Sequence, residues 1–248
     1  MMNNFWAIIP ARYGSTRFVG KPLAQIDGLP MIIHVLNNVS KSKIKNIYVA
    51  TDDNRIYNVV NNFGYNAIIT DVNHRNGTER VNEAANILNI PNNDYIINIQ
   101  GDEPFISSKL IDDLIDFVSD KNIKLATAAS SFENFDELFS PNNIKITTDL
   151  NSKALYFSRS IIPYNRDLDC KEWLNAYPYK KHIGIYVYEK VILNELTKLK
   201  PTLLEETEKL EQLRWLDNGY SIYVMDTDYK SISIDTPEDL QNIKKFIV

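Results

Sequence analysis

The stretch FWAIIPARYGSTRFVGKPL, residues 5–23, decides the fold of this 248-residue chain. Its first part, residues 5–9, is a short apolar run that ends at Pro10, and such a run is typical of a buried β-strand. A loop with two glycines and three cationic side chains follows the run directly. Loops in that position bind ligands in α/β proteins, so the stretch predicts both a first strand and a candidate site.

Strand-like and helix-like patterns alternate along the chain beyond this stretch. We expect further strands at residues 45–50, 66–70, 94–99 and 125–130, and helices at residues 31–39, 55–63, 78–88 and 107–118. Alternation at this spacing indicates right-handed βαβ units and a mainly parallel sheet. Ligands of such sheets lie beyond the carboxyl ends of the strands, so the loops after the first, third and fourth strands are the expected functional loops.

The alternation loosens after about residue 134. We expect strands at residues 144–148, 154–157 and 182–188, then a helix at 203–216, a strand at 222–225 and a closing helix at 237–246. The irregular part is expected to be an antiparallel flap or an oligomer surface. We therefore expect one domain over residues 1–248, with an insertion for dimerisation or sugar binding at about residues 134–190.

Composition argues against several classes of protein. The hydrophobic content of 44% allows a substantial core, and a formal net charge of −5 with scattered basic residues argues against broad nucleic-acid binding. The single cysteine, Cys170, allows no internal disulfide and favours a reducing, cytoplasmic compartment. Because no apolar segment reaches the length of a membrane span and the N-terminal run lacks the layout of a signal peptide, we expect no membrane insertion.

The loop after the first strand has the parts needed to hold a triphosphate. Glycines let the backbone approach an anion closely, hydroxyls and exposed N–H groups can form an anion-binding nest, and cations balance the phosphate charge. The residues concerned are Arg12, Gly14, Ser15, Thr16, Arg17, Gly20 and Lys21. The spacing is neither the Walker nor the dinucleotide pattern, and the alternative is an ordinary solvated loop with stray charges.

Two acidic stretches far apart in the sequence are candidates for a metal site. In QGDEP, residues 100–104, Asp102 follows the fourth expected strand, where a carboxylate is well placed to hold Mg²⁺ on a phosphate. In SIDTPEDL, residues 233–240, the Thr-Pro pair is a good helix start, but a cap does not explain Asp235 just before it. The alternative for each aspartate is a plain turn residue.

Separate strings along nearly the whole chain resemble the 3-deoxy-manno-octulosonate (Kdo) cytidylyltransferases, the CMP-Kdo synthetase family. The first stretch is similar to that family's signature I-P-A-R-x-x-S-T-R-L-P-G-K-P-L and departs from it at Phe18 and Val19, where Leu-Pro is usual. The two acidic stretches also match. Further similar strings are HRNGTER at residues 74–80, ALYFSRSIIP at 154–163, KHIGIY at 181–186 and LEETEKLEQLR at 204–214.

The resemblance implies a fold, an activity and partners. The fold is a Rossmann-like, mainly parallel α/β sheet of the nucleotidyltransferase, glycosyltransferase-A-like type with an antiparallel insertion. The implied reaction transfers CMP from CTP to the anomeric hydroxyl of Kdo and releases pyrophosphate, for lipopolysaccharide synthesis. Mg²⁺ is the implied cofactor, CTP and an acidic sugar are the implied ligands, and the family is typically homodimeric.

The resemblance also implies roles for particular residues. The implied catalytic residues are Arg12, Lys21, Asp102 and Asp235, of which the two aspartates are the implied Mg²⁺ ligands. The implied nucleotide contacts are Arg12, Gly14, Ser15, Lys21, Thr78, Arg80 and Gln100, and the implied sugar contacts are Gln100, Arg159, His182, Tyr186, Glu211 and Gln212. The residue types alone leave alternatives, namely a simple helix cap with an exposed Arg80, a structural His182 and an exposed acidic helix face at Glu211.

Other functions fit parts of the pattern. The same reaction on 8-amino-Kdo or a nonulosonate needs the same strings. A nicotinamide-dependent Rossmann oxidoreductase predicts a glycine-rich dinucleotide turn, which the first loop lacks. A non-catalytic sugar-nucleotide binding protein does not require Lys21, Asp102 and Asp235 together, and the presence of all three argues against it.

Overall fold

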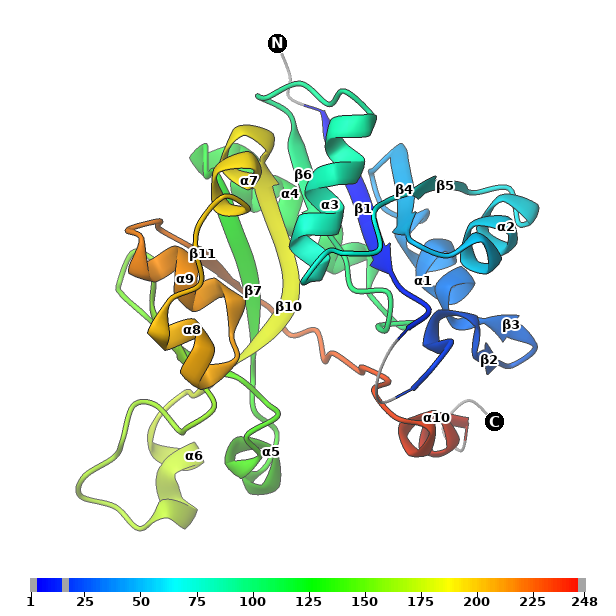
Figure 1. Ribbon diagram of the computed structural model, residues 1–248. Helices are drawn as coiled ribbons and strands as arrows, with labels where there is room; N and C mark the ends of the chain where they lie inside the picture. Colours follow the sequence, from blue (N-terminus) through cyan, green and yellow to red (C-terminus); the bar gives the residue numbers. More distant parts are fainter. Residues whose placement is uncertain (1–3, 15–17, 245–248) are drawn as a thin grey trace.

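A nine-stranded mixed sheet forms the centre of the protein, whose residues 4–14 and 18–244 are described by the computed structural model (Figure 1). The strand order is β11-β7-β10-β6-β1-β4-β5, with β8 paired to β10 and β9 paired to β8. The strands are β1 (Phe5–Ala11), β4 (Asn46–Thr51), β5 (Asn66–Ile69), β6 (Tyr95–Asn98), β7 (Leu125–Ser131), β8 (Lys145–Thr148), β9 (Ala154–Ser158), β10 (Lys180–Glu189) and β11 (Tyr223–Asp226). A separate small hairpin pairs β2 (Gln25–Ile26) with β3 (Leu29–Pro30).

The expected parallel sheet is confirmed where the first four predicted strands lie. Strand β1 pairs in parallel with β4 and with β6, and β5 pairs in parallel with β4. Strand β10 runs antiparallel between β6 and β7, and β11 is parallel to β7. The carboxyl ends of β1, β4, β5 and β6 therefore meet at one edge of the sheet.

Helices cover both faces of this sheet. They are α1 (Met31–Val39), α2 (Asn54–Asn62), α3 (Gly77–Ile87), α4 (Ser108–Lys121), α5 (Phe135–Phe139), α6 (Trp173–Ala176), α7 (Lys190–Leu196), α8 (Leu203–Glu208), α9 (Glu211–Asp217) and α10 (Pro237–Lys244), with 3₁₀ turns at Lys21–Leu23 and Cys170–Glu172. One buried cluster joins α1, α2 and α4 to Ala7 and Ile9 of β1, and a second joins α3, α7 and α9 to Ile8. Successive β1 side chains thus enter opposite cores, which explains why residues 5–9 are apolar without interruption.

The part that follows β7 is irregular, as expected. Helices α5 and α6 lie together at the lower end of the molecule (Figure 1), where Phe132, Leu138, Trp173 and Tyr179 form a small core of their own. Strands β8 and β9 form the expected antiparallel pair. Strand β8 also pairs with the start of β10, so this segment is joined directly to the central sheet.

The single helix expected at residues 203–216 is wrong. Helix α8 ends at Glu208, Lys209 adopts a left-handed conformation with φ of 54°, and α9 begins at Glu211. The break turns Leu210 into the core, where it is only 6% exposed. Burial of this leucine accompanies a backbone conformation that lysine seldom adopts.

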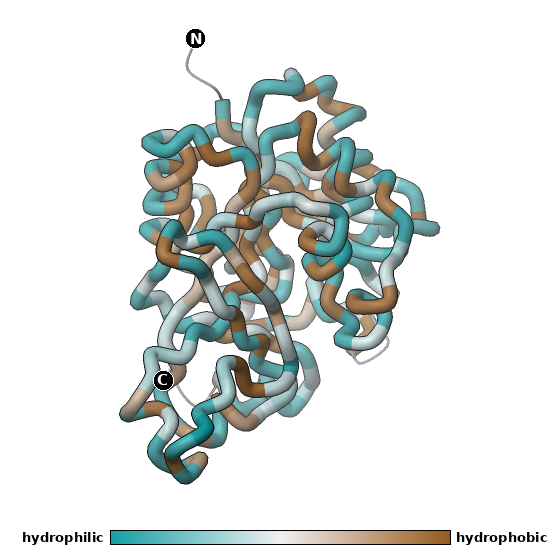
Figure 2. The backbone as a smooth tube through the Cα atoms, turned by 90° about the vertical axis from the view of Figure 1, so that its left-hand side faces the viewer, coloured by the Kyte–Doolittle hydropathy of each residue, from teal (hydrophilic) through white to brown (hydrophobic). Residues whose placement is uncertain are grey.

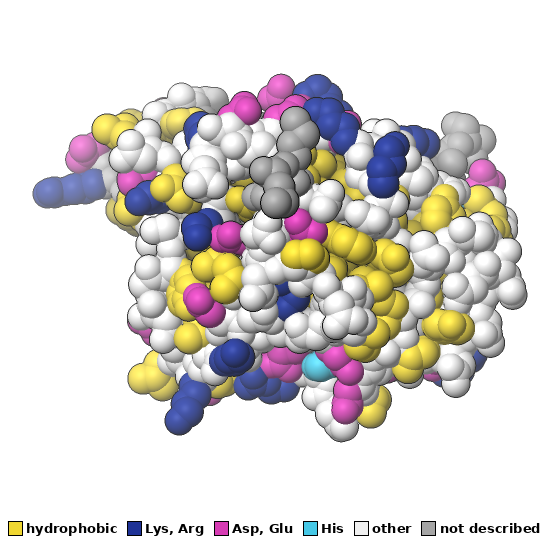
Figure 3. All heavy atoms as spheres, turned by 90° about the horizontal axis from the view of Figure 1, so that it is seen from above, with side chains coloured by type: hydrophobic (Ala, Val, Ile, Leu, Met, Phe, Trp, Pro, Cys, Tyr) yellow, Lys and Arg dark blue, Asp and Glu magenta, His cyan; other side chains and the backbone are white. Residues whose placement is uncertain are grey.

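Hydropathy and charge follow the layers. Hydrophobic segments run mainly through the interior and hydrophilic segments mainly along the outer turns (Figure 2). On the face seen in Figure 3, basic and acidic side chains are interspersed around hydrophobic ones. Among the described residues, no helix combines the length and the apolar character that crossing a membrane requires.

Candidate active site

A cavity of about 390 Å³ lies at the carboxyl edge of the parallel strands. The segments that follow β1, β5 and β6 line it, together with a residue from the C-terminal part of the chain. The lining residues are Pro10, Ala11, Arg12, Lys21, Pro22, His74, Arg75, Asn76, Gly77, Arg80, Gln100, Gly101, Asp102 and Asp235. These are the three loops that the sequence predicted to be functional.

Two glycines let the first loop and the β6 loop meet at the cavity. A Cβ on Gly101 would lie 3.0 Å from the carbonyl oxygen of Pro10, so only glycine fits between the ends of β6 and β1 without a shift. Gly20 has φ of +71° and its N–H donates to the carbonyl of Tyr13 over 2.9 Å. This hydrogen bond closes the loop and places Lys21 at the cavity wall.

The two predicted carboxylates share one cation. The Lys21 Nζ donates to Asp102 Oδ2 over 2.6 Å and to Asp235 Oδ1 over 3.2 Å. A backbone hydrogen bond of 3.0 Å from Ile234 N to the carbonyl of Asp102 joins the two segments directly. The structure thus brings the two acidic stretches together at Lys21, directly after the first loop.

A capping box at the start of α10 positions Asp235. Asp239 Oδ2 accepts from the backbone N–H groups of Asp235 and Thr236, over 3.0 and 2.8 Å. In return the N–H of Asp239 donates to Thr236 Oγ1 over 3.1 Å. The helix start predicted from Thr-Pro is confirmed, and it fixes the backbone of the residue just before the cap.

The donor set fits Mg²⁺. The carboxylates of Asp102 and Asp235 converge on one positive charge while their side chains stay 28% and 38% exposed, so oxygen atoms of a ligand can reach them. Mg²⁺ prefers oxygen ligands and commonly uses one or two carboxylates together with phosphate and water. Within residues 4–14 and 18–244, no group of three or more His, Cys, Asp or Glu side chains could hold a metal, so this pair would need such additional oxygen donors.

The cavity cations differ in how their charge is balanced. Arg80 is 3% exposed and donates to Thr70 Oγ1 over 2.6 Å and to Asp52 Oδ2 over 2.7 Å, so the exposed arginine of the alternative interpretation is wrong. Arg12 is exposed and has no hydrogen-bond or ion-pair partner among the described residues. Arg12 is therefore the cavity cation best able to attract an anionic ligand.

Thr78 does not line the cavity, although the sequence grouped it with the nucleotide contacts. It is 4% exposed, and its Oγ1 donates to Glu211 Oε2 over 2.7 Å. Asn76 caps α3 instead, since its side chain accepts from the N–H of Glu79. Arg214 Nη2 donates to the other oxygen of Glu211 over 2.6 Å, and burial raises the pKa of this glutamate. The exposed acidic face of the alternative interpretation is therefore wrong for Glu211, which is held in place by two donors.

His182 packs against the rings of Phe157 and Tyr186 and is neutral in the folded protein. Burial lowers its pKa to about 3. Its Nε2 lies 2.9 Å from Thr127 Oγ1, and the same hydroxyl lies 2.8 Å from the carbonyl oxygen of Ile185. Because the threonine has only one proton to give to that carbonyl, the histidine Nε2–H donates to Thr127, which leaves Nδ1 as an acceptor.

Two buried polar atoms near His182 have no hydrogen-bond partner within the described part of the chain. They are Tyr186 OH and Trp215 Nε1. Burial raises the pKa of Tyr186, so its hydroxyl remains protonated and can both donate and accept. Unpaired buried polar groups indicate water or a ligand close by, which fits the predicted sugar contact of Tyr186.

The remaining predicted residues differ in their positions relative to the cavity. Gln100 lines it and donates from Nε2 to the carbonyl of Gly184 over 3.0 Å. Gln212 is buried, and Gly14 is exposed without lining the cavity. Ser15, Thr16 and Arg17 lie outside the described residues.

Arg159 is not brought to the cavity. Its Nε donates to the carbonyl of Glu208 over 2.6 Å, and Nη1 donates to the carbonyl of Pro141 over 2.9 Å. Its guanidinium thus binds backbone groups beside the break between α8 and α9. The predicted contact with a sugar carboxylate stays a prediction.

Sequence reasoning missed the partner of Arg80 and the burial of Glu103. Asp52 neutralises Arg80, and its position directly after β4 was the available signal. Glu103 is 5% exposed beside Asp102 and accepts from Ser231 Oγ over 2.8 Å. Burial raises the pKa of Glu103 to about 7, a property that no sequence pattern indicates.

Known proteins are similar to this chain over nearly its whole length. A family model described as cytidylyltransferase matches residues 6–246. The 3-deoxy-manno-octulosonate cytidylyltransferase of Parabacteroides distasonis is 46% identical, with 99% of each chain covered. The enzyme of the same name from Fusobacterium nucleatum is 47% identical, with 98% of this chain and 96% of the relative covered.

A solved structure is also similar. It is a CMP:2-keto-3-deoxy-manno-octonic acid synthetase complexed with CTP, with a TM-score of 0.91 and 34% sequence identity. The match covers 99% of this chain and 98% of the solved one.

Proposed function

Because the chain belongs to the 3-deoxy-manno-octulosonate cytidylyltransferase family, we propose that it transfers CMP from CTP to the anomeric hydroxyl of Kdo and releases pyrophosphate. The observation that supports this most directly is the meeting of Asp102 and Asp235 at Lys21, on the edge of the sheet where α/β proteins bind nucleotides. The CTP complex of the similar synthetase supports CTP as the nucleotide.

The chain's own residues would first reduce the cost of bringing two anions together. Arg12 is exposed and has no partner within residues 4–14 and 18–244, and Lys21 lies at the same wall. Both would bind phosphate oxygens and stabilise the negative charge that develops as the anomeric oxygen attacks the α-phosphorus and pyrophosphate leaves. Lys21, which hydrogen bonds to both aspartates hold in place, would also favour the in-line approach of the sugar.

Mg²⁺ is the proposed cofactor. Asp102 and Asp235 would hold it, because they are the two carboxylates that already converge on a cation. When bound, the ion would supply Lewis-acid stabilisation of phosphate charge. The fixed backbone of Asp235 in its capping box means that this carboxylate needs little reorganisation to serve as a ligand.

The sugar would lie beside β10. Gln100 connects the cavity to Gly184, and His182 and Tyr186 lie on either side of this glycine in the same strand. His182 Nδ1 can accept from a sugar hydroxyl, and the unpaired Tyr186 hydroxyl and the anchored Glu211 carboxylate can form further hydrogen bonds. A set of fixed acceptors and donors suits a polyhydroxylated acidic sugar.

We further propose a homodimer in the cytoplasm. Leu155 on β9 and Leu203 on α8 are 63% and 81% exposed, and large exposed apolar side chains suit an interface. The single cysteine fits a reducing compartment. Size-exclusion chromatography with light scattering would test the dimer, and a monomer at working concentration would contradict it.

Turnover tests the central proposal. The protein is incubated with CTP, Mg²⁺ and Kdo, and pyrophosphate release is followed, with 8-amino-Kdo and a nonulosonate in parallel. We expect Kdo to be consumed fastest. Consumption of another sugar without Kdo would identify the alternative substrate, and no release with any sugar would contradict a cytidylyltransferase.

Substitutions test the carboxylates. Asp102→Asn and Asp235→Asn should each lower kcat by about a hundredfold or more, because each removes one charge from the metal pair. Asp120→Asn, at an exposed position near the end of α4, is the control. Circular dichroism confirms that each variant is folded, and unchanged turnover would remove the role of that aspartate.

A further inference from the structure

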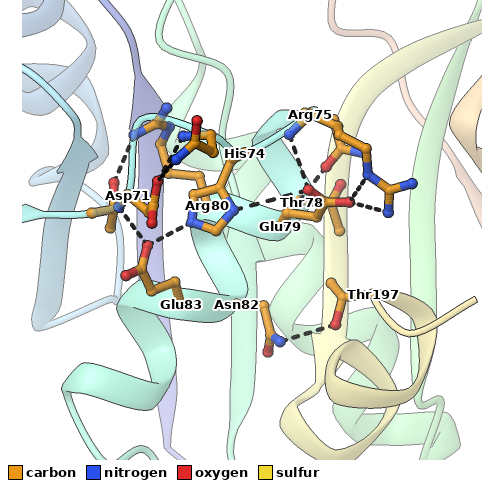
Figure 4. Close-up of polar contacts among 12 residues, drawn as sticks. Asp71, His74, Arg75, Thr78, Glu79, Arg80, Asn82, Glu83 and Thr197 are labelled. Carbon is orange, nitrogen blue, oxygen red and sulfur yellow. Dashed lines mark hydrogen bonds and ion pairs between the residues drawn. The ribbon is translucent and has the colours of Figure 1, made fainter.

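The loop after β5, which lines the cavity, is hydrogen-bonded to two carboxylates of α3. Glu79 and Glu83 lie four residues apart on α3 and face back toward the preceding loop (Figure 4). The loop residues His74 and Arg75 line the cavity, but neither glutamate does. The glutamates therefore touch the loop on the side away from the ligand space.

Glu83 holds the first part of the loop. Its Oε2 accepts from the backbone N–H of Asp71 over 2.8 Å and from Nε2 of His74 over 2.5 Å. Asp71 in turn accepts from the N–H of Asn73 over 2.7 Å. One carboxylate thus fixes both the chain entering the loop and the ring that faces the cavity.

Glu79 holds the second part. Its Oε2 accepts from the N–H of Arg75 over 3.0 Å, and its Oε1 accepts from the Nε of the same residue over 2.7 Å (Figure 4). The arginine backbone and side chain are therefore both fixed. Asn76, the next residue, accepts from the N–H of Glu79 itself, so the contact is reciprocal.

The arrangement is unusual for a site that would take a triphosphate, because negative charges near the site weaken anion binding. Here each carboxylate accepts two hydrogen bonds from the loop, so its negative charge is directed at the loop donors and not at the cavity. The helix thereby orders the loop before the ligand arrives, and preordering reduces the entropy lost on binding.

We propose that Glu79 and Glu83 are positioning residues, which hold the loop residues His74–Gly77 in the conformation that binds the nucleotide. Neither glutamate would contact the nucleotide itself. This inference rests on the proposed function only in taking CTP as the ligand of the cavity. It predicts a defect in CTP binding and not in sugar binding, because the loop lines the nucleotide cavity.

Glu83→Ala and Glu83→Gln separate positioning from general stability. The alanine removes the acceptor of both loop donors, and we expect the Kd for CTP, measured by calorimetry, to rise roughly tenfold. Glutamine keeps one acceptor oxygen and should recover most of the affinity. Asp120→Ala, on α4 and outside the cavity, should leave the Kd unchanged.

Hydrogen exchange supplies a second readout that does not depend on turnover. The amides of residues 71–76 should exchange faster in Glu83→Ala than in the native protein, and CTP should restore part of their protection. A Kd within twofold of the native value, or equal losses with alanine and glutamine, would overturn the proposal. If Glu83→Ala does not fold, Glu79→Ala and Glu79→Gln are compared in the same way, and native exchange at residues 71–76 with native CTP affinity in Glu79→Ala would overturn it.

The two proposals fail in distinguishable ways. If the native protein binds CTP but turns over no acidic sugar, the proposed reaction is wrong and the calorimetric comparison still tests the positioning role. If Kdo is turned over and both glutamates can be replaced without effect on CTP binding, the proposed function stands and the positioning role is wrong.

Discussion

Replacement of Lys21 by methionine should make the protein more dependent on Mg²⁺ for its stability. Lys21 Nζ lies 2.6 Å from one carboxylate oxygen of Asp102 and 3.2 Å from one of Asp235. Among the described residues, the ammonium is thus a cation that contacts both acids and offsets part of their mutual repulsion. Methionine keeps most of the length of the side chain but carries no charge. The carboxylates of Asp102 and Asp235 should then repel each other more strongly and destabilise the folded protein.

The size of the effect follows from the distances. Two oxygens within 2.6 and 3.2 Å of one nitrogen can be no more than about 6 Å apart. At an effective dielectric constant of about 20, two unit charges at that separation repel by about 3 kcal/mol. Because the side chains are partly exposed, solvent screening reduces this to about 1–2 kcal/mol. For a chain of this size that is a fall in Tm of roughly 2–8 °C.

Thermal unfolding with and without Mg²⁺ measures the change in Tm of Lys21→Met. The variant should have a lower Tm than the native protein without metal, and Mg²⁺ should raise its Tm further than that of the native protein, because the ion no longer competes with the ammonium. Lys109→Met, which removes an exposed ion pair with Asp113 on α4, is the control. Equal Mg²⁺-dependent shifts in the variant and in the native protein would refute the reasoning.

Three further outcomes are expected. Burial lowers the pKa of His182 from its ordinary value of 6.5 to about 3, so the unfolded chain binds more protons between these values and stability falls as the pH falls through that window. The free energy of unfolding in urea should therefore fall by about 2 kcal/mol less in His182→Asn than in the native protein between about pH 7 and pH 5. Equal decreases in the two proteins would contradict a neutral histidine. Thr78→Val should raise the KM for Kdo about fivefold and leave the KM for CTP unchanged, because the substitution removes a hydrogen bond that holds Glu211. Thr78→Ser should restore the KM for Kdo. A change in the KM for CTP alone would favour the nucleotide contact. Arg159→Ala should lower the free energy of unfolding by about 2 kcal/mol in chemical denaturation, since it leaves the carbonyl of Glu208 without its donor, and native stability would show that this contact contributes little.

The sequence predicted the sheet and the position of the site because both depend on local patterns. Uninterrupted apolar runs marked strands buried on both faces, such as β1 and β6, and the loops after them had to meet at one edge. Asp102 and Asp235 could be paired in advance because each stands in a string that resembles the Kdo cytidylyltransferases, and the resemblance implies that both are metal ligands.

Contacts between remote side chains and backbone groups could not be predicted. The donors of Arg159 bind carbonyl oxygens, which every residue has, so no residue type indicated the partner. The hydroxyl of Thr78 meets a carboxylate 133 residues away, and a threonine near a helix start suggests a cap far more often than such a contact. The break between α8 and α9 could not be predicted either, because no sequence pattern indicates that Lys209 adopts a left-handed backbone conformation.

The hydrogen bond from Ile234 to Asp102 has a consequence for biosynthesis of the protein. A nascent chain that has emerged as far as β11 already contains Lys21 and Asp102, yet the long segment that crosses to α10 (Figure 1) has not docked. All nine strands of the sheet have then been made, but the site still lacks Asp235. The polypeptide therefore acquires this charged cluster only after the segment beyond β11 has been made and has docked.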